Sequence, residues 1–313
     1  MQVVFMGTPA FSIPVLEALL GAGHSVVGVY TQPDKPRGRG RVAEAPAIKS
    51  YAISKGLPVF QSVSLKAEEV QAQLRGLAPQ AIVVAAYGKL LPLPVLKIPP
   101  FGCLNVHPSL LPKYRGASPV ASAILEGDSR AGVTIILMDE GMDSGPILLQ
   151  EEEEIRDEDT AESLTGRLFV AGARLVVAAL AKLEKGDLQP IPQDGAQATF
   201  TRLLTKEEGE LDFAREALQL WRQVRAHHPW PGSYTYWQGK LLKVQEARPL
   251  PAIEGKPAGL VVPVWGEPGT PIAVVTGKGL LGLRRVQLEG KSPVGAEEFL
   301  RGYRGILGAA LPD

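Results

Sequence analysis

Short apolar runs alternate with amphipathic segments through the first half of the chain, and this alternation limits the fold more than any other feature of the sequence. Residues 3–6, 25–30 and 81–85 are apolar runs with the length of buried strands. Residues 12–20 and 46–55, which lie between such runs, carry apolar residues at helical spacing. Strands that alternate with helices are typical of a doubly wound, mainly parallel sheet, so we expect an α/β fold.

Two further apolar runs, at residues 103–106 and 133–137, predict buried strands that end in polar loops. Further helices are expected at residues 118–125 and 160–183. In a doubly wound sheet, ligands bind at the carboxyl ends of the strands. The polar residues that follow these two runs are therefore candidates for a functional site.

The second half of the chain has a different pattern. Residues 189–206 contain two prolines and scattered Gln, Thr and Gly, as interdomain linkers do. A helix is expected at residues 213–226, followed by five short strands with Gly and Pro turns at residues 234–237, 240–245, 259–264, 271–275 and 280–287. Such strands predict a small OB-like β-barrel. We place the first domain at residues 1–188, the linker at 189–207 and the second domain at 208–313.

Charge and cysteine content exclude several classes of protein. The formal net charge is +0, which excludes a generally basic protein that coats polyanions but allows a local basic patch. The single cysteine, Cys103, allows no internal disulfide and suits a reducing compartment. No run approaches a membrane span, and Met1 and Gln2 lead directly into an apolar strand rather than a charged signal-peptide start. We expect a soluble cytoplasmic protein.

Asn105 and His107 stand two residues apart in the predicted strand at residues 103–107. Residues i and i+2 of a strand point to the same face, so the amide and the imidazole are expected to project together. Asn105 is the only asparagine in the sequence. The pair has two interpretations: a catalytic one, and a structural one in which the His is a satisfied buried residue and the Asn caps backbone groups.

A second segment, at residues 138–146, favours the catalytic interpretation. It places Asp143 between glycines after another apolar run. A carboxylate on such a loop can approach an imidazole on a neighbouring strand, orient the ring and raise its pKa. Asn105, His107 and Asp143 together form a plausible acyl-transfer site: a donor for an oxyanion, an acid/base group and its orienting carboxylate.

Other kinds of chemistry lack the residues they need. The first strand runs into G-T-P-A-F at residues 7–11, which is neither G-x-G-x-x-G nor a Walker loop, so no dinucleotide or nucleoside triphosphate is expected there. Neither Ser109 nor Cys103 has a base and an orienting group of its own, so no covalent nucleophile is indicated. His227 and His228 lack the partners of a zinc site, and we assign no metal.

The loop at residues 32–44 contains four basic residues within seven positions: Lys35, Arg37, Arg39 and Arg41. One interpretation is a solvated polar face. The other is a flexible arm that follows a phosphate backbone, because Arg and Lys on a Gly-rich loop bind phosphates without reading bases.

The motif N-x-H-P-S-L-L-P-x-Y-R-G at residues 105–116, followed by D-x-G-x-D-S-G at residues 139–145, resembles the 10-formyltetrahydrofolate-dependent formyltransferase family. The resemblance implies a Rossmann-like formyltransferase domain, 10-formyltetrahydrofolate as formyl donor, and catalytic roles for Asn105, His107 and Asp143. It also implies that folate is bound by Ser109, Leu110, Leu111, Pro112 and, from the A-Y-G segment, Tyr87.

The basic loop and the run H-x-P-W-P-G-S-Y at residues 227–234 are similar to the methionyl-tRNA formyltransferase branch of this family. This similarity implies that a monomeric enzyme formylates methionyl-tRNA, that the second domain binds tRNA, and that the acceptor side is contacted by Lys35, Arg37, Arg39, Arg41 and Phe11. Alternatives are hydrolysis of 10-formyltetrahydrofolate, formyl transfer to an amino sugar or a small nucleotide, and a non-catalytic RNA-binding protein.

Overall fold

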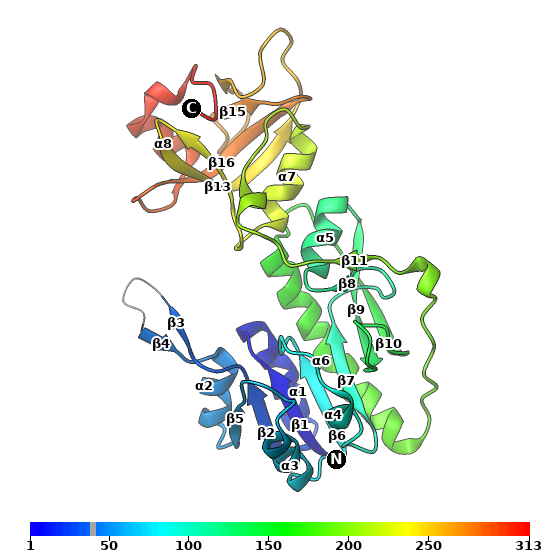
Figure 1. Ribbon diagram of the computed structural model, residues 1–313. Helices are drawn as coiled ribbons and strands as arrows, with labels where there is room; N and C mark the ends of the chain where they lie inside the picture. Colours follow the sequence, from blue (N-terminus) through cyan, green and yellow to red (C-terminus); the bar gives the residue numbers. More distant parts are fainter. Residues whose placement is uncertain (38–41) are drawn as a thin grey trace. The chain divides into compact units, whose positions relative to one another are not determined.

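The computed structural model describes residues 1–37 and 42–313 of the chain, which divides into two compact units (Figure 1). The first unit comprises Met1–Pro119, Arg130–Glu154 and Thr165–Thr201. The second comprises Val120–Ser129, Ile155–Leu164 and Arg202–Asp313. Each unit is described by itself below.

A seven-stranded sheet forms the centre of the first unit, in the order β10-β9-β7-β6-β1-β2-β5. The strands β1 (Gln2–Gly7), β2 (Ser25–Thr31), β5 (Val59–Gln61), β6 (Ala81–Ala85) and β7 (Cys103–His107) are parallel to their neighbours among these five. The strands β9 (Arg130–Leu137) and β10 (Ile147–Glu154) add antiparallel pairs at one edge. The predicted doubly wound, mainly parallel sheet is confirmed.

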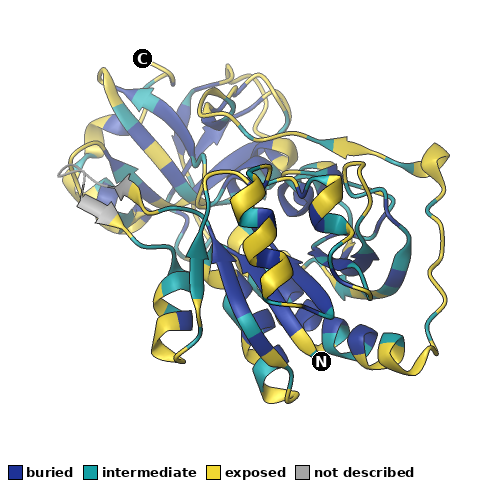
Figure 2. Ribbon diagram, turned by 60° about the horizontal axis from the view of Figure 1, so that its bottom comes forward, coloured by how far each residue is buried: buried dark blue, intermediate teal, exposed yellow. Residues whose placement is uncertain are grey.

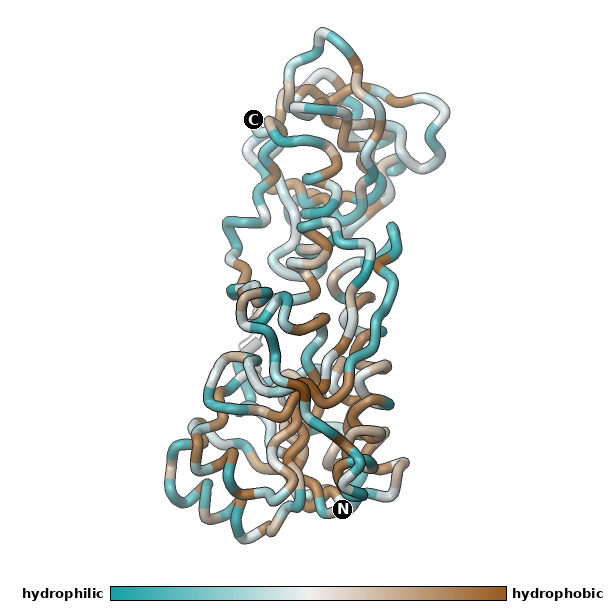
Figure 3. Tube along the Cα trace, turned by 90° about the vertical axis from the view of Figure 1, so that its right-hand side faces the viewer, coloured by the Kyte–Doolittle hydropathy of each residue, from teal (hydrophilic) through white to brown (hydrophobic). Residues whose placement is uncertain are grey.

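Helices cover both faces of this sheet because both faces of its central strands are apolar. Val3 and Phe5 of β1 belong to one core cluster, together with residues of α1 (Ile13–Gly21), α2 (Ala47–Ser54) and α6 (Ala161–Lys185). Val4 and Met6 belong to the opposite cluster, with residues of α3 (Glu68–Gly76) and α4 (Leu93–Leu96). Figure 2 shows the central strands of this sheet as mainly buried, and Figure 3 shows hydrophobic segments concentrated in the interior of this unit.

One expectation from the sequence was wrong. Helix α6 is long and apolar enough, by length and composition, to cross a membrane. Half of its most apolar stretch is buried inside the protein, and Phe169, Val176 and Leu180 pack in the core of the first unit. The helix has the length and apolar composition of a membrane span because it packs along a sheet and is rich in Ala, Val and Leu.

Two features were not predicted from the sequence. The four glutamates at residues 151–154 complete β10, where partly buried and exposed glutamates alternate and several pair with arginines, for example Glu151 with Arg174 at 3.1 Å. The basic loop contains a β-hairpin of β3 (Lys35–Arg37) and β4 (Val42–Glu44). Helices α3, α4 and α8 were not expected, because their short apolar patterns are weak.

The second unit is an antiparallel half-barrel. Its strands are β12 (Ser233–Trp237), β13 (Lys240–Leu250), β14 (Val261–Pro263), β15 (Ile272–Val275), β16 (Leu280–Leu288) and β17 (Val294–Gly295). All the pairs are antiparallel, and two irregularities between Val244 and Ala247 interrupt the register of β13. Helices α7 (Ala217–Ala226) and α8 (Ala296–Gly302) close its core, and α5 (Pro119–Glu126) falls almost entirely within this unit.

The segment at residues 189–207, which was predicted to be a linker, begins in the first unit. Ile191 exchanges two backbone hydrogen bonds of 2.8 Å with Ile147. The short strand β11 (Phe200–Thr201) then pairs in parallel with β8 (Arg115–Gly116). The stretch Thr165–Thr201 thus belongs to the first unit, and the segment that starts at Arg202 belongs to the second. The predicted boundaries at 188/189 and 207/208 stay predictions.

Candidate active site

Strand β7 carries the two polar residues that the sequence singled out. Cys103 of this strand packs in the α3/α4 core cluster, whereas Leu104 and Val106 pack in the opposite one. Strand alternation therefore places Asn105 and His107 on the α3/α4 face of the sheet, near the carboxyl end of β7. His107 is 4% exposed, so its imidazole is almost wholly removed from water.

Asp143 reaches these two residues from the loop between β9 and β10. Its Oδ1 lies 3.2 Å from Asn105 Nδ2, which donates to it, and 3.6 Å from His107 Nδ1. Its Oδ2 accepts a hydrogen bond of 2.9 Å from the backbone N–H of Gly116. The three side chains predicted to form one site are therefore in contact.

Asp143 does not lie directly at the end of β9 beside the end of β7, as two parallel strands would place it. Because β9 runs antiparallel to β7, its end at Leu137 pairs with Leu104, at the beginning of β7. The loop turns back toward the end of β7, and the Leu137 N–H donates to the Pro146 carbonyl at 3.0 Å. Gly145 allows this turn, since a Cβ there would lie 1.8 Å from the Leu137 oxygen.

Two residues of the site have a backbone conformation that non-glycine residues rarely adopt. Asp143 has φ +50° and Tyr114 has φ +61°, both in the left-handed region. Such conformations cost of the order of 1–3 kcal/mol and persist where surrounding contacts over-determine them. Here they aim the Asp143 carboxylate and the Tyr114 carbonyl at the same imidazole.

The hydrogen bond of His107 to Tyr114 determines its tautomer. His107 Nε2 lies 3.0 Å from the Tyr114 carbonyl oxygen. Because a carbonyl only accepts, Nε2 carries the proton, and Nδ1, which faces Asp143, is the atom that gains or loses one.

Burial lowers the pKa of His107, and the Asp143 carboxylate and the Tyr114 carbonyl oppose only part of this effect. The predicted effect of Asp143 is present, since its carboxylate raises the pKa of His107, but burial outweighs it and the net direction is downward. The sequence showed the opposite charge but not the depth of burial, and loss of hydration disfavours the imidazolium more than one carboxylate favours it.

The segment at residues 109–112 is tied to the strands beside it. The Thr134 hydroxyl donates to the Ser109 carbonyl at 2.6 Å and accepts from the Leu111 N–H at 3.2 Å. Gln150 Nε2 donates to the Leu111 carbonyl at 3.0 Å. Leu110 packs against the backbone near Gly132, and the Leu111–Pro112 peptide bond is cis. Most backbone groups of residues 109–112, the segment predicted to bind folate, thus have hydrogen-bond partners within the protein.

Tyr87 and Phe11 follow β6 and β1, which are adjacent strands of the sheet. The Tyr87 ring is buried in the α3/α4 core cluster, and its backbone carbonyl accepts from Thr8 Oγ1 and Gln32 Nε2, both at 3.1 Å. Burial raises the pKa of Tyr87 to about 12. Phe11 is 38% exposed, and its ring lies 4.8 Å from that of Phe169.

The basic hairpin is anchored at its base. Asp34 forms a salt bridge of 2.8 Å with Lys49 and accepts from Gln61 Nε2 at 2.7 Å. Lys35 is exposed at the start of β3, and Arg37 ends that strand. Arg39 and Arg41 lie outside the described residues.

Comparison with known proteins agrees with this geometry. The formyl transferase family model matches residues 1–180, and the model of the formyl transferase C-terminal domain matches residues 203–304. The chain belongs to the formyl transferase family. A methionyl-tRNA formyltransferase from Anaeromyxobacter dehalogenans is 46% identical over 305 residues, which cover 97% of each chain. One from Roseiflexus sp. is 45% identical and covers 100% of this chain and 96% of its own.

Among solved structures, HypX from Aquifex aeolicus in complex with tetrahydrofolic acid superposes with a TM-score of 0.67 at 19% identity. The match covers 99% of this chain and 48% of HypX, so this chain spans about half of that protein. At this identity the likeness shows the fold.

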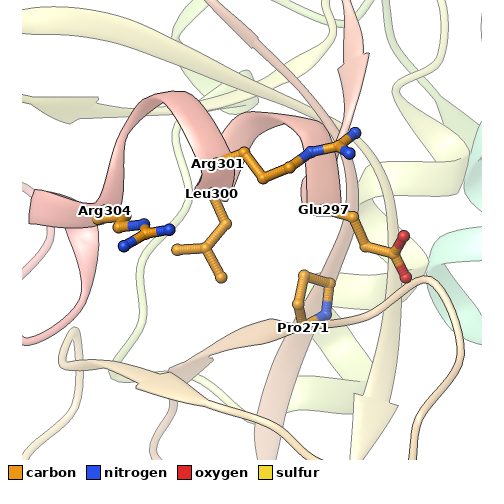
Figure 4. A pocket seen from close by; sticks show the side chains of 5 residues that line it. All are labelled: Pro271, Glu297, Leu300, Arg301 and Arg304. Carbon is orange, nitrogen blue, oxygen red and sulfur yellow. The ribbon is translucent and has the colours of Figure 1, made fainter.

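Cys103 and a hollow in the second unit are further features outside the site formed by Asn105, His107 and Asp143. Within residues 1–37 and 42–313, His, Cys, Asp and Glu side chains form no group of three that could hold a metal ion. Burial raises the pKa of the Cys103 thiol to about 12, which keeps it protonated. A surface hollow of about 280 Å³ in the second unit is lined by Pro271, Glu297, Leu300, Arg301 and Arg304 (Figure 4).

Sequence reasoning missed the backbone groups that complete the site. The Tyr114 carbonyl and the Gly116 N–H belong to the motif at residues 105–116. They reach His107 and Asp143 only because the chain turns back after Pro112, and the sequence does not show this turn. The glycine at 116 was the available signal, because φ +108° at that position and the nearness of the Thr201 oxygen exclude a side chain.

Proposed function

We propose that this chain transfers the formyl group of 10-formyltetrahydrofolate to the α-amine of methionyl-tRNA. The observation that carries the proposal is that the Asn105, His107 and Asp143 side chains converge in a chain whose whole length matches proteins named methionyl-tRNA formyltransferase, at 42–46% identity. The sequence match covers both units of the chain.

In this reaction the amine attacks the formyl carbon and a tetrahedral intermediate with an anionic oxygen forms. The Asn105 amide has two N–H bonds, and one of them donates to Asp143. We assign the other to the anionic oxygen. A donor held in place before the reaction stabilises developing charge without reorganisation, which is why such donors are worth about 10²–10³ in rate.

His107 acts as the proton relay. Its lowered pKa keeps the ring neutral near neutral pH, with the Nδ1 lone pair directed at the Asp143 side. When a proton leaves the attacking ammonium, directly or through water, Nδ1 receives it. The imidazolium that results has Nε2–H on the Tyr114 carbonyl and Nδ1–H facing the carboxylate, so both of its N–H groups have acceptors.

We propose that the folate binds at the carboxyl ends of the neighbouring strands β1, β6 and β7. Ser109, Leu110, Leu111, Pro112 and Tyr87 stay the predicted contacts. The buried Tyr87 hydroxyl has no hydrogen-bond partner among the described residues, but its ring lies in the protein core. We therefore assign the folate contact at this position to the backbone around Tyr87 rather than to its side chain. The folate supplies the activated formyl group.

For the tRNA we propose that the basic hairpin, with Lys35, Arg37, Arg39 and Arg41, and Phe11 contact the acceptor end, and that the half-barrel contacts another part of the molecule. Positive charge on an arm anchored at its base suits phosphate binding. Because the substrate belongs to translation, we place the enzyme in the cytoplasm, and we propose that it acts as a monomer.

The deciding experiment measures incorporation of labelled formyl from 10-formyltetrahydrofolate into methionyl-tRNA, with uncharged tRNA and free methionine as controls. We expect label in the charged tRNA alone. Folate consumption without labelled tRNA would indicate the hydrolase or a small-molecule acceptor such as an amino sugar or a glycinamide nucleotide. Failure to consume folate, together with no folate-induced rise in Tm, would favour a non-catalytic RNA-binding protein.

A further inference from the structure

Gln193 contacts the loop that carries Asp143 from a distant part of the sequence. It lies in the segment that leads out of the first unit, beyond residues 1–180 that match the formyl transferase model. Its Nε2 donates to the backbone carbonyl of Asp143 at 2.8 Å and to that of Gly145 at 2.7 Å. A single amide thus holds both ends of the left-handed turn that aims the carboxylate.

The other end of the Gln193 amide is held as well. Its Oε1 accepts from Arg115 Nε at 3.1 Å and from Arg115 Nη2 at 2.8 Å. A guanidinium only donates and a carbonyl only accepts, so these contacts leave one orientation of the amide. Arg115 is itself 8% exposed, and its backbone N–H donates to the Thr199 carbonyl at 2.8 Å. The Gln193 amide, which we call the clamp, is therefore held by hydrogen bonds at both of its ends.

The clamp controls the distances on which the site depends. The Asp143 carboxylate has to meet Asn105, His107 and the Gly116 N–H together, and these come from two other segments. A shift of the loop by a fraction of an ångström breaks at least one of these interactions, and misplacement of about 1 Å can cost about 10²-fold in rate. Gln193 can therefore affect catalysis without touching either substrate.

We propose that Gln193 is a positioning residue that holds the Asp143 carboxylate against Asn105 and His107 through the two loop carbonyls. This rests on the role assigned to Asp143 in the proposed function. The segment that joins the units is then part of the active site's support.

The main test variant is Gln193→Glu in the full chain. Glutamate keeps the size of the side chain and the acceptor for Arg115, but it cannot donate to the two carbonyls. We expect kcat to fall about 10–100-fold, the usual cost of losing a residue that supports a site, with KM for both substrates within about threefold. Gln197→Glu is the matched control, because Gln197 is an exposed glutamine of the same segment whose side chain donates to Asp194, away from the loop. It should keep the parent kcat.

A double-variant cycle separates positioning from mere stabilisation. If Gln193 acts through Asp143, adding Gln193→Glu to Asp143→Ala should lower single-turnover rates by less than about twofold, because residues that act as a unit are not additive. A full additional loss, or a lowered Tm with the parent kcat, would overturn the proposal.

Gln193→Met, which removes donors and acceptor at similar length, repeats the test if the charged variant folds poorly. Loss of folding in both variants would assign Gln193 to stability and also overturn it. A parent-like rate for Asp143→Ala is a different outcome, since it would remove the proposed role of Asp143 itself.

Discussion

The loop at residues 138–146 and the hairpin at residues 35–44 are both polar, Gly-containing segments that leave strands of the same sheet. The first is hydrogen-bonded along its length, at Met138, Asp139 and Asp143. The second is held at its base through Asp34 and by its own strand pairing. A loop that performs chemistry must keep one carboxylate within a fraction of an ångström, whereas an arm that follows phosphates needs charge and reach.

The largest effects should come from the catalytic side of this comparison. Asp143→Ala removes the partner of the imidazolium and of the Asn105 amide, and we expect a loss of about 10³–10⁴ in the single-turnover rate. Asn105→Ala should lose about 10²–10³. Glu140→Ala, an exposed carboxylate of the same loop, is the control and should stay near the parent rate. A parent-like rate for the folded Asp143→Ala protein would contradict the mechanism.

The loop's backbone is tested by two glycines. At Gly145 a Cβ would lie 1.8 Å from the Leu137 carbonyl, so Gly145→Ala must displace the loop; we expect a loss of about 10²-fold in kcat. At Gly141 the nearest atom is the movable Ser144 hydroxyl, so Gly141→Ala should cost much less. Steady-state kinetics and Tm for both proteins check this. Equal losses in the two would mean that the loop's position matters little.

On the hairpin side, replacing Lys35, Arg37, Arg39 and Arg41 by Ala should raise KM for methionyl-tRNA roughly tenfold or more and leave kcat nearly unchanged. The slope of log affinity against log salt should fall by about one for each phosphate that the variant no longer neutralises. Lys55→Ala, an exposed lysine of the same unit, is the control. A fall in kcat at unchanged KM would place the hairpin with the catalytic loop instead.

The smallest effect concerns pH. Burial lowers the pKa of His107 below 6.5, so the neutral base predominates above that value. We expect kcat to be flat near neutral pH and to fall by at most about tenfold per pH unit on the acid side. Asp143→Asn should move the inflection lower, because it removes the charge that raises the pKa. A pH–kcat profile with its inflection above 6.5 would contradict this.

The same shift affects stability. Between the lowered pKa and 6.5 the folded protein binds fewer protons at His107 than the unfolded chain, so the free energy of unfolding falls as pH drops through that window. Burial also lowers the pKa values of His24 and His227, and they act in the same direction. Tm measured against pH in the parent and in His227→Asn, which removes one of these groups, checks the sign.

Much of the fold could be predicted because its signals are local. The apolar runs that became β1, β2 and β6 and the helical spacing of α1 depend on neighbouring residues only. The four glutamates of β10 were not predicted as part of a strand, because a strand at the edge of a sheet can carry carboxylates on its exposed side, and edge position is not a local property.

The residues of the candidate site likewise divide into those that local sequence patterns predict and those that they do not. Asn105 and His107 could be paired from the sequence because strand alternation is local, and Asp143 because a glycine-framed loop after a strand is a recognisable pattern. Tyr87 shows the limit of this reasoning, since the sequence does not show that its ring lies in the core; its contact with folate stays a prediction.

The sequence by itself determined the alternation of strands and helices in the first unit, the three residues proposed for the site and the basic character of the hairpin. Only the tertiary structure decided that Asp143 meets both partners, that His107 carries its proton on Nε2 with a lowered pKa, and that Gln193 clamps the loop. Distances, burial and hydrogen-bond partners act through space, between residues that lie from 7 positions apart in the chain, for His107 and Tyr114, to 50 positions apart, for Asp143 and Gln193.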